Sequence, residues 1–257
     1  MHSYKLTVAY EGTQYYGWQW QVNQISVDRV IRESFLRAFS QDSMYLVGSS
    51  RTDAGVHAHG QVIRIGTEID INSEKLKSVL NRTLPPTIVI RDCEKISPLS
   101  RFHPQHNIKN KVYIYRFFLK RPLPIVQNYG FFIEQNIDTH KLGEALSLFV
   151  GTHDFEGFSK ELSDKNTTRT IESIALAPCE VTGGYKITIV GKSFLRHMIR
   201  RIVGASIEIA KKKNRSLSEL KKLLLNPRLQ NKNLPTAPAK GLCLESITYT
   251  ENENEGK

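Results

Sequence analysis

Cysteine is scarce in this chain of 257 residues, and its few cysteines show no pattern. The three thiols, at Cys93, Cys179 and Cys243, lie far apart in the sequence. They form neither a disulfide framework nor the paired CxxC spacing of a zinc site. We therefore expect three buried thiols in a reducing compartment.

Long apolar runs are missing as well. The N-terminus, M-H-S-Y-K, lacks the apolar core of a signal peptide, and no apolar stretch is long enough to cross a bilayer. The sequence also has no phosphate-binding P-loop, dinucleotide fingerprint or set of zinc ligands. The sequence therefore predicts a cytoplasmic protein that does not associate with a membrane and needs no metal, nucleotide or redox cofactor.

Acidic residues are too few to balance the basic ones. The chain has 36 Lys and Arg against 25 Asp and Glu, which gives a formal net charge of +11. The first 107 residues carry 12 basic and 10 acidic side chains, and the rest of the chain carries 24 and 15. A field of this sign favours a polyanionic partner such as nucleic acid. A generically basic protein without such a partner is the alternative.

Hydrophobic periodicity predicts a similar succession of elements twice. In the first half we expect a helix capped by Ser26, another beginning after Ser73, and strands at Tyr4–Tyr10, Met44–Val47, Gly60–Ile65 and Thr87–Ile96. In the second half we expect helices at Asp138–Val150, Phe194–Lys211 and Ser218–Leu225, and strands at Lys111–Leu119, Ile171–Val181, Tyr185–Val190 and Leu242–Tyr249. Gly183-Gly184 is typical of a hairpin turn.

This order predicts an α+β fold of two ferredoxin-like (β-α-β-β-α-β) halves with antiparallel sheets. We place the halves at residues 1–103 and 108–250, because the stretch between them contains Pro104 and follows Pro98. Residues 251–257 form a polar tail that we expect to be frayed.

The most informative segment is S-R-T-D-A-G-V-H-A-H, residues 50–59. It places Arg51 and Asp53 in a polar loop between two predicted strands, where a rigid sheet can present reactive groups. Spacing alone also allows an ordinary Asx-type turn, in which Asp53 accepts backbone N–H groups and Arg51 is solvated. His57 and His59 alternate along the next strand as a metal pair would, but no third or fourth ligand is evident.

Together with seven other segments, this loop resembles the active-site signature of the TruA-type tRNA pseudouridine synthases. The segments follow one another in the family's order and span nearly the whole chain. They are Tyr16–Gln19 (Y-G-W-Q), Asn81 with Leu84-Pro85, Phe102-His103, Tyr113–Tyr115 (Y-I-Y), Gly151–Phe155 (G-T-H-D-F), Phe194–Arg200 (F-L-R-H-M-I-R) and Ala237–Leu242 (A-P-A-K-G-L).

The resemblance implies an enzyme that isomerises uridine to pseudouridine at positions 38 to 40 of the tRNA anticodon stem-loop, acting as a homodimer without a cofactor. It implies that Asp53 is the catalytic nucleophile, attacking either C1′ or C6. It gives substrate-binding roles to Tyr113, which would stack on the uracil and assist proton removal, to Arg51, and to Arg200, the cation expected beside Asp53. The RNA would lie in a central cleft formed by the two sheets, with the target base extruded from its stack.

The same residues also have plainer interpretations. Tyr113 fits an alternating aromatic of a half-buried strand, and Arg51 could face solvent. Arg200 shares a predicted basic helix face with Arg196 and Arg201, and this face could simply bind phosphate. Two other functions therefore stay open. One is a non-catalytic RNA-binding protein with two sheet platforms. The other is a hydrolase with an Asp nucleophile, which would need a second carboxylate near Asp53.

Three positions depart from the family's usual pattern. Ser50 stands where glycine is usual before the arginine, and a serine would be strained there if the position required a positive φ. Gln105 and Trp20 stand where basic residues are usual. These departures bear on RNA affinity and on the choice among neighbouring uridines.

Overall fold

The computed structural model describes residues 1–160, 166–180, 183–211, 216–226 and 234–250, and it divides into two compact units. The first unit contains residues 1–109 and the chain from Leu244 onward, and the second contains residues 110–243. The sequence placed the C-terminal strand in the second half. In the structure, the chain from Leu244 onward belongs to the first unit instead. Its Glu245 carbonyl packs against Gly60, where a Cβ would lie only 2.5 Å from the carbonyl oxygen.

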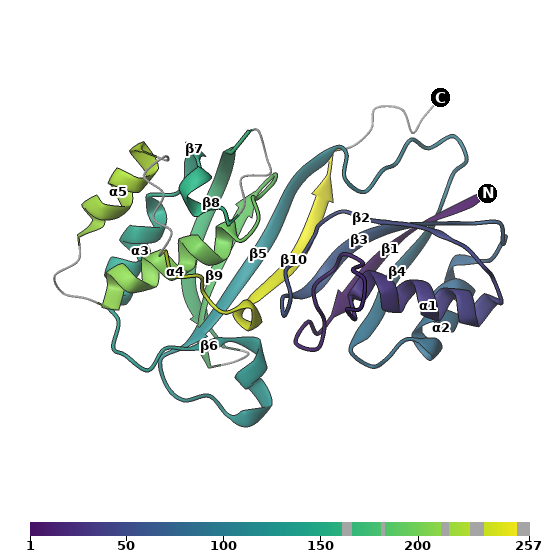
Figure 1. Cartoon of the computed structure of the whole chain (residues 1–257), viewed down its shortest axis with the longest axis horizontal. Helices are drawn as coiled ribbons and strands as arrows, with labels where there is room; N and C mark the ends of the chain where they lie inside the picture. Colours follow the sequence, from purple (N-terminus) through teal and green to yellow (C-terminus); the bar gives the residue numbers. More distant parts are fainter. Residues whose placement is uncertain (161–165, 181–182, 212–215, 227–233, 251–257) are drawn as a thin grey trace. The chain divides into compact units, whose positions relative to one another are not determined.

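The first unit has the β-α-β-β-α-β order expected from the sequence. Its elements are β1 (His2–Tyr10), α1 (Val27–Phe39), β2 (Tyr45–Gly48), β3 (His57–Thr67), α2 (Ser73–Thr83) and β4 (Ile88–Ile96). β1 pairs antiparallel with β4 on one side and β3 on the other, and β2 also pairs antiparallel with β3. Figure 1 shows α1 and α2 side by side on one face of this sheet.

The first helix forms where its cap and its apolar stripe predict it. The Ser26 side chain accepts a hydrogen bond from the Arg29 backbone N–H, which satisfies one free donor of the first turn. Val27, Ile31 and Phe35 recur at helical spacing and are buried, so this stripe anchors α1 on the sheet. The predicted start of α1 is confirmed.

The second unit contains helices and further strands, which pair mostly antiparallel. Its elements are β5 (Ile108–Phe118), β6 (Phe131–Phe132), α3 (Thr139–Ser147), β7 (Gly151–Asp154), β8 (Thr168–Cys179), β9 (Gly184–Gly191), α4 (Met198–Lys211) and α5 (Leu217–Leu225), and β10 (Leu242–Tyr249) begins at its end. The strand order is β5-β9-β8-β7, and the two-residue β6 runs parallel to β5. α3 packs against both α4 and α5.

Some boundaries in this unit differ from the sequence prediction. The long helix begins at Met198 instead of Phe194, because His197 takes a left-handed conformation with φ 61° that breaks a helix. β7 was not predicted, since G-T-H-D has no apolar alternation. β8 and β9 pair antiparallel down to Cys179 and Gly184, as the hairpin prediction requires. Residues 181–182, which include the end of the predicted strand Ile171–Val181, and the tail 251–257 lie outside the described residues.

The chain is therefore a mixed α+β protein whose strands pair mostly antiparallel, as its periodicity predicted. All three cysteines are free and buried, which confirms the prediction of three buried thiols. Burial raises the pKa of the Cys93 thiol to about 12, so this thiol stays protonated and unreactive. No helix within the described ranges is long and apolar enough to cross a membrane.

Candidate active site

The Asp53 loop connects β2 to β3 in the first unit. Within it Arg51 is exposed, Thr52 is buried and Asp53 is half-buried. The backbone N–H of Val56 donates to the Asp53 carbonyl at 3.1 Å and closes a turn directly after the carboxylate. The structure thus places Arg51 and Asp53 in one short loop between β2 and β3, as the sequence predicted.

The loop that follows β1 holds the Asp53 loop by its backbone. The Trp18 N–H donates to the Thr52 carbonyl at 3.1 Å, and the Gly55 N–H donates to the Tyr15 carbonyl at 3.2 Å. The Tyr10 and Thr52 hydroxyls share a buried hydrogen bond of 2.8 Å. These contacts flank Asp53 on both sides, so β1 and the loop that follows it hold the backbone next to the carboxylate.

Glycine makes this close approach possible at Gly17. Its φ is +85°, and a Cβ there would lie 2.6 Å from the Thr52 carbonyl oxygen. Any side chain would therefore both strain the backbone and push against the residue that precedes Asp53. The glycine of the Y-G-W-Q segment and the R-T-D-A-G loop form one packed arrangement.

Two of the departures from the family pattern have structural explanations. Ser50 has a negative φ, so a serine there carries no left-handed strain. The Gln61 side chain accepts a hydrogen bond from the Ser50 N–H and donates one to the Ser50 carbonyl, at 3.2 and 2.5 Å. The Gln105 side chain donates to the Gly48 carbonyl at 2.9 Å, at the end of β2. Gln61 and Gln105 thus hydrogen-bond to the backbone of Ser50 and Gly48, which lead into the Asp53 loop.

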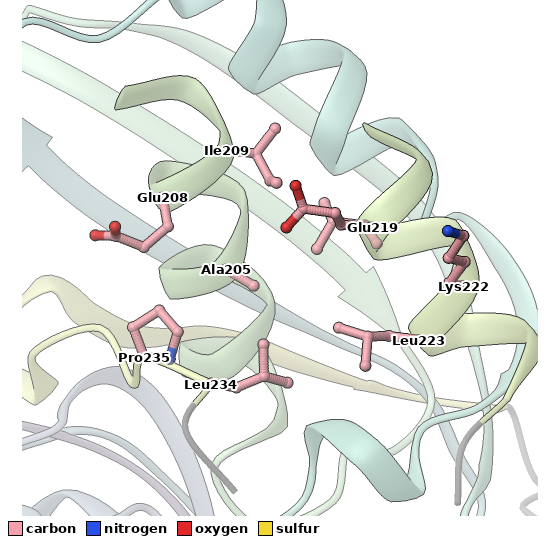
Figure 2. A pocket seen from close by; sticks show the side chains of 9 residues that line it. Ala205, Glu208, Ile209, Glu219, Lys222, Leu223, Leu234 and Pro235 are labelled. Carbon is pink, nitrogen blue, oxygen red and sulfur yellow. The ribbon is translucent and has the colours of Figure 1, made fainter. Parts of the chain in front are cut away.

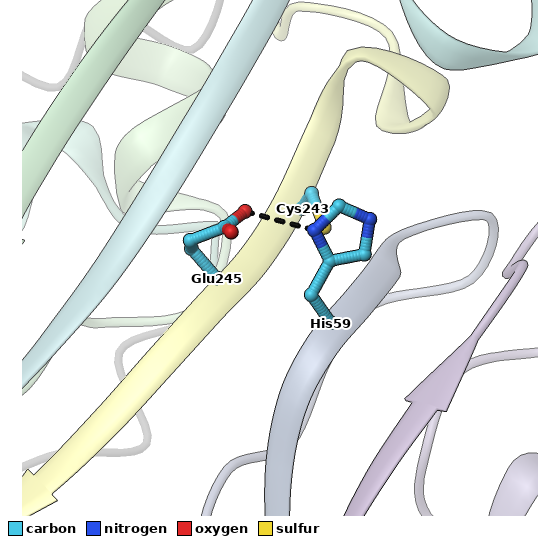
Figure 3. A group of neighbouring side chains, drawn as sticks. All are labelled: His59, Cys243 and Glu245. Carbon is cyan, nitrogen blue, oxygen red and sulfur yellow. Dashed lines mark hydrogen bonds and ion pairs between the residues drawn. The ribbon is translucent and has the colours of Figure 1, made fainter. Parts of the chain in front are cut away.

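The two histidines of β3 have separate partners. His57 is buried, and its Nδ1 accepts the Gly12 N–H at 3.0 Å. His59 is exposed, and its Nδ1 lies 3.0 Å from Glu245 Oε2, the pair joined by the dashed line in Figure 3. Cys243, also drawn there, precedes Glu245 by two residues on β10 and is buried. His57 and His59 therefore do not converge on one metal ion.

Tyr113 lies on β5 in the second unit. It is buried and makes an edge-to-face contact with Phe194, with ring centroids 5.4 Å apart. A Cβ on Gly191, the last residue of β9, would lie 3.1 Å from the Phe194 ring. The glycine therefore leaves room for the ring. Phe194, the first residue of the F-L-R-H-M-I-R segment, thereby positions Tyr113.

Arg200 lies on α4 in the same unit, near the strand that carries Tyr113. Its Nε donates to the Ala237 carbonyl at 2.8 Å, while the Tyr115 hydroxyl donates to the neighbouring Pro238 carbonyl at 3.0 Å. Burial raises the pKa of Tyr115, and the positive charge of Arg200 opposes that rise. The second unit therefore brings Arg200 close to the Y-I-Y strand through the A-P-A-K-G-L segment.

The other two arginines of the predicted basic face, Arg196 and Arg201, do not share a helix face with Arg200. Arg196 precedes α4, and its carbonyl accepts the Lys160 N–H at 3.3 Å. The Arg201 guanidinium donates to the Ser159 carbonyl at 2.6 Å and to the Gly157 carbonyl at 3.3 Å. Burial lowers the pKa of Arg201. Arg201 thus ties α4 to the segment after β7, a structural use of its charge.

The family profile described as tRNA pseudouridine synthase matches residues 6–106 and 145–250 of this chain. The chain belongs to the tRNA pseudouridine synthase family.

Curated relatives match along their whole length. The chain is 38% identical over 259 residues to tRNA pseudouridine synthase A 1 of Protochlamydia amoebophila, covering 99% of this chain and 98% of that protein. It is 35% identical to tRNA pseudouridine synthase A of Clostridium kluyveri, covering 97% and 100%, and 37% identical to the enzyme of the same name from Thermodesulfovibrio yellowstonii, covering 97% and 100%.

Sequence reasoning missed residues that hold the candidate segments of this synthase in place within each unit. Tyr10, Thr52 and Trp18 fix the Asp53 loop, and Phe194 and Tyr115 organise the strand that carries Tyr113. None of these side chains is charged at neutral pH, so a search for chemically reactive groups passes over them. The sequence signal that could have found them is their position, because four of the five lie within the family segments: Thr52, Trp18, Phe194 and Tyr115.

A pocket of about 240 Å³ lies between α4 and α5 (Figure 2). Its lining is mostly apolar, with Leu234 and Pro235 closing one side. The acid Glu208 at its edge pairs with Lys211 at 2.8 Å. None of the residues expected to carry the synthase chemistry lines it.

Lys111 is a buried cation on the same face of β5 as Tyr113. It is 9% exposed, and burial lowers its pKa to about 8. Because the folded-state pKa lies below the ordinary value of 10.5, the folded protein disfavours the ammonium. The free energy of unfolding should therefore rise as pH increases from about 8 to about 10.5, where the folded chain has lost a proton that the unfolded chain keeps.

We expect Lys111→Met to raise the free energy of unfolding at pH 7 by up to about 3 kcal/mol relative to the native chain. The difference should shrink as the pH rises from 8 to 10.5. Urea unfolding of both proteins at several pH values measures it. Lys109→Met, at an exposed position two residues earlier on β5, is the control and should not change the pH dependence. A constant difference across this pH range would contradict the assignment.

Proposed function

We propose that this chain isomerises uridine to pseudouridine in the anticodon stem-loop of tRNA, at positions 38 to 40. The observation that carries the proposal is the R-T-D-A-G loop, whose backbone is hydrogen-bonded on both sides of Asp53 by the loop that follows β1, through Trp18 and Tyr15. A rigidly held, half-buried carboxylate suits a nucleophile better than an ordinary surface turn does. Membership of the family and the named relatives support the same reaction.

The proposed reaction conserves every atom of the uridine. The bond between C1′ and N1 breaks, the uracil turns, and a bond forms between C1′ and C5. The C5 proton is released to solvent and N1 takes up a proton, so the product has the same composition as the uridine. Asp53 supplies the nucleophile, at C1′ or at C6, so no oxidant or other co-reactant is required. Tyr113 stacks on the uracil and assists removal of the C5 proton, and Arg51 and Arg200 bind the substrate as cations.

We further propose a homodimer that shares one tRNA and works in the cytoplasm, with each half of the chain built as a ferredoxin-like module. The family resemblance supports the dimer. The β-α-β-β-α-β order and the antiparallel pairing of the first unit support the module.

Position mapping tests the choice of uridines. Unmodified tRNA transcripts with uridine at 38, 39 or 40, each alone, are incubated with the protein and the pseudouridines are located by chemical probing. We expect modification at these positions and none in a transcript with cytidine at all three. Modification confined to another stem would overturn the anticodon assignment while leaving the reaction class intact.

The two alternative functions give different results in the same assay. A non-catalytic RNA-binding protein would bind the transcripts and leave every uridine unchanged. A hydrolase with an Asp nucleophile would release free uracil or sugar in place of pseudouridine.

Tyr113→Phe separates stacking from proton removal. The phenyl ring keeps the contact with Phe194 and can still stack on the base, but it has no hydroxyl. We expect tRNA affinity and melting temperature to stay close to those of the native protein, and isomerisation under single-turnover conditions to fall by about 10²-fold. A variant that isomerises at the native rate would show that the hydroxyl takes no part in the reaction.

A further inference from the structure

The loop between β1 and α1 carries apolar side chains that the protein itself does not cover. Trp20 is 44% exposed and Val22 is 81% exposed, although Trp18 in the same loop is 2% exposed. The loop is closed at its base by hydrogen bonds from Tyr16 N–H to the Ile25 carbonyl at 2.9 Å and from Asp28 N–H to the Trp18 carbonyl at 3.1 Å. Trp20 is thus presented from a backbone that is tethered at both ends of the loop.

An arginine lies over the ring of Trp20. The Arg29 guanidinium carbon is 5.5 Å from the ring centroid, a cation–π contact. Arg29 Nε also donates to Glu33 Oε1 at 2.7 Å, one helical turn further along α1. Glu33 on α1 therefore positions the Arg29 guanidinium, and the guanidinium in turn contacts the Trp20 ring. We call this pair the Trp20 platform.

The Trp20 platform is joined to the Asp53 loop by a short stretch of backbone. Trp18, two residues before Trp20, donates its N–H to the Thr52 carbonyl, and Thr52 directly precedes Asp53. Gly17 packs on the same carbonyl with no room for a side chain. A nucleotide on the platform would therefore have a defined position relative to the carboxylate, because both elements belong to one packed unit.

We propose that the Trp20 platform stacks an unpaired nucleobase of the tRNA beside the uridine that reacts. This inference rests on the proposed function and adds a binding site for a second nucleotide. Unpaired bases are read by aromatic rings and arginine planes, and every base offers a face for stacking. The surface joins an indole to the Arg29 guanidinium, and this combination suits an RNA base better than the apolar face of another protein.

Tryptophan fluorescence reports on this site, because the chain has only two tryptophans and Trp18 is buried. A base stacked on Trp20 quenches its emission. We expect an anticodon stem-loop RNA to quench the native protein and to leave the emission of Trp20→Phe, which retains only Trp18, nearly unchanged. Trp20→Phe should still bind, because phenylalanine also stacks.

Affinity measured by filter binding completes the test. We expect Trp20→Ala to bind the stem-loop about 5- to 150-fold more weakly, as loss of one stacked base predicts. The dependence of its affinity on salt should stay as in the native protein, because stacking releases no counterions. Val22→Ala, a more exposed apolar position in the same loop, is the matched control and should bind as the native chain does.

The outcomes separate this inference from the proposed function. If the native protein forms pseudouridine and Trp20→Ala binds RNA equally well, the platform is not a base site and the function stands. If Trp20→Ala changes the sedimentation of the free protein while its RNA affinity is unaltered, the surface contacts a second copy of the chain and the inference is overturned. If the native protein neither binds nor modifies tRNA, both proposals fail together.

Discussion

Replacing Asp53 by Asn is expected to abolish isomerisation while folding and tRNA binding stay close to native. An amide has nearly the same size as the carboxylate and keeps the turn, but it is a poor nucleophile and cannot stabilise a developing cation. Phosphate contacts supply most of the affinity for RNA, so the dissociation constant should change little. We expect the single-turnover rate to fall by at least about 10³-fold.

The control is Asp92→Asn, an exposed carboxylate on β4 in the same unit, which should leave the rate and the melting temperature unchanged. Mass spectrometry must exclude deamidation of the Asp53→Asn protein back to the native residue. A turn role for Asp53 would give the opposite pattern, namely a modest loss of stability with turnover retained.

Gly17→Ala should damage both stability and catalysis. The added Cβ meets the Thr52 carbonyl oxygen at 2.6 Å, and the residue must hold φ at +85°. We expect the free energy of unfolding to fall by about 1–3 kcal/mol. Because the atom that must move belongs to the residue before Asp53, isomerisation by the folded variant should fall more than tRNA affinity does.

Gly143→Ala is the matched control for this substitution. Gly143 lies inside α3, where a Cβ meets nothing within 4 Å, so alanine should stabilise the protein by roughly 0.5–1 kcal/mol. A Gly17→Ala variant that is folded and isomerises at the native rate would show that the packing of the two loops does not position the carboxylate.

The elements of the fold were predictable where local signals agree. Ser26 and the apolar stripe behind it define α1, and the alternation of Tyr4, Leu6 and Val8 defines β1. The start of α4 was not predictable, because the left-handed conformation of His197 is imposed by its surroundings and has no signature in the segment itself. The return of the C-terminal strand to the first unit also depends on long-range pairing, which periodicity does not encode.

The sequence identified the segments that carry the candidate site residues, but it did not indicate which contacts hold those segments in place. The R-T-D-A-G loop identified Asp53, but nothing in its spacing indicated that Trp18 and Tyr15 would hold the neighbouring backbone. Arg201 was grouped with Arg200 as a basic face, whereas its guanidinium is committed to the Gly157 and Ser159 carbonyls. A formal charge in a sequence does not say whether the side chain meets solvent, substrate or a carbonyl.

The central claim is tested most directly by tritium release from tRNA labelled at C5 of its uridines, with native protein, excess tRNA and a chelator present. We predict multiple turnovers, with one tritium released to water for each pseudouridine formed and no loss of rate in the chelator. Tight binding of the tRNA with no release of tritium would contradict the account, because it would leave an RNA-binding protein without the isomerase reaction.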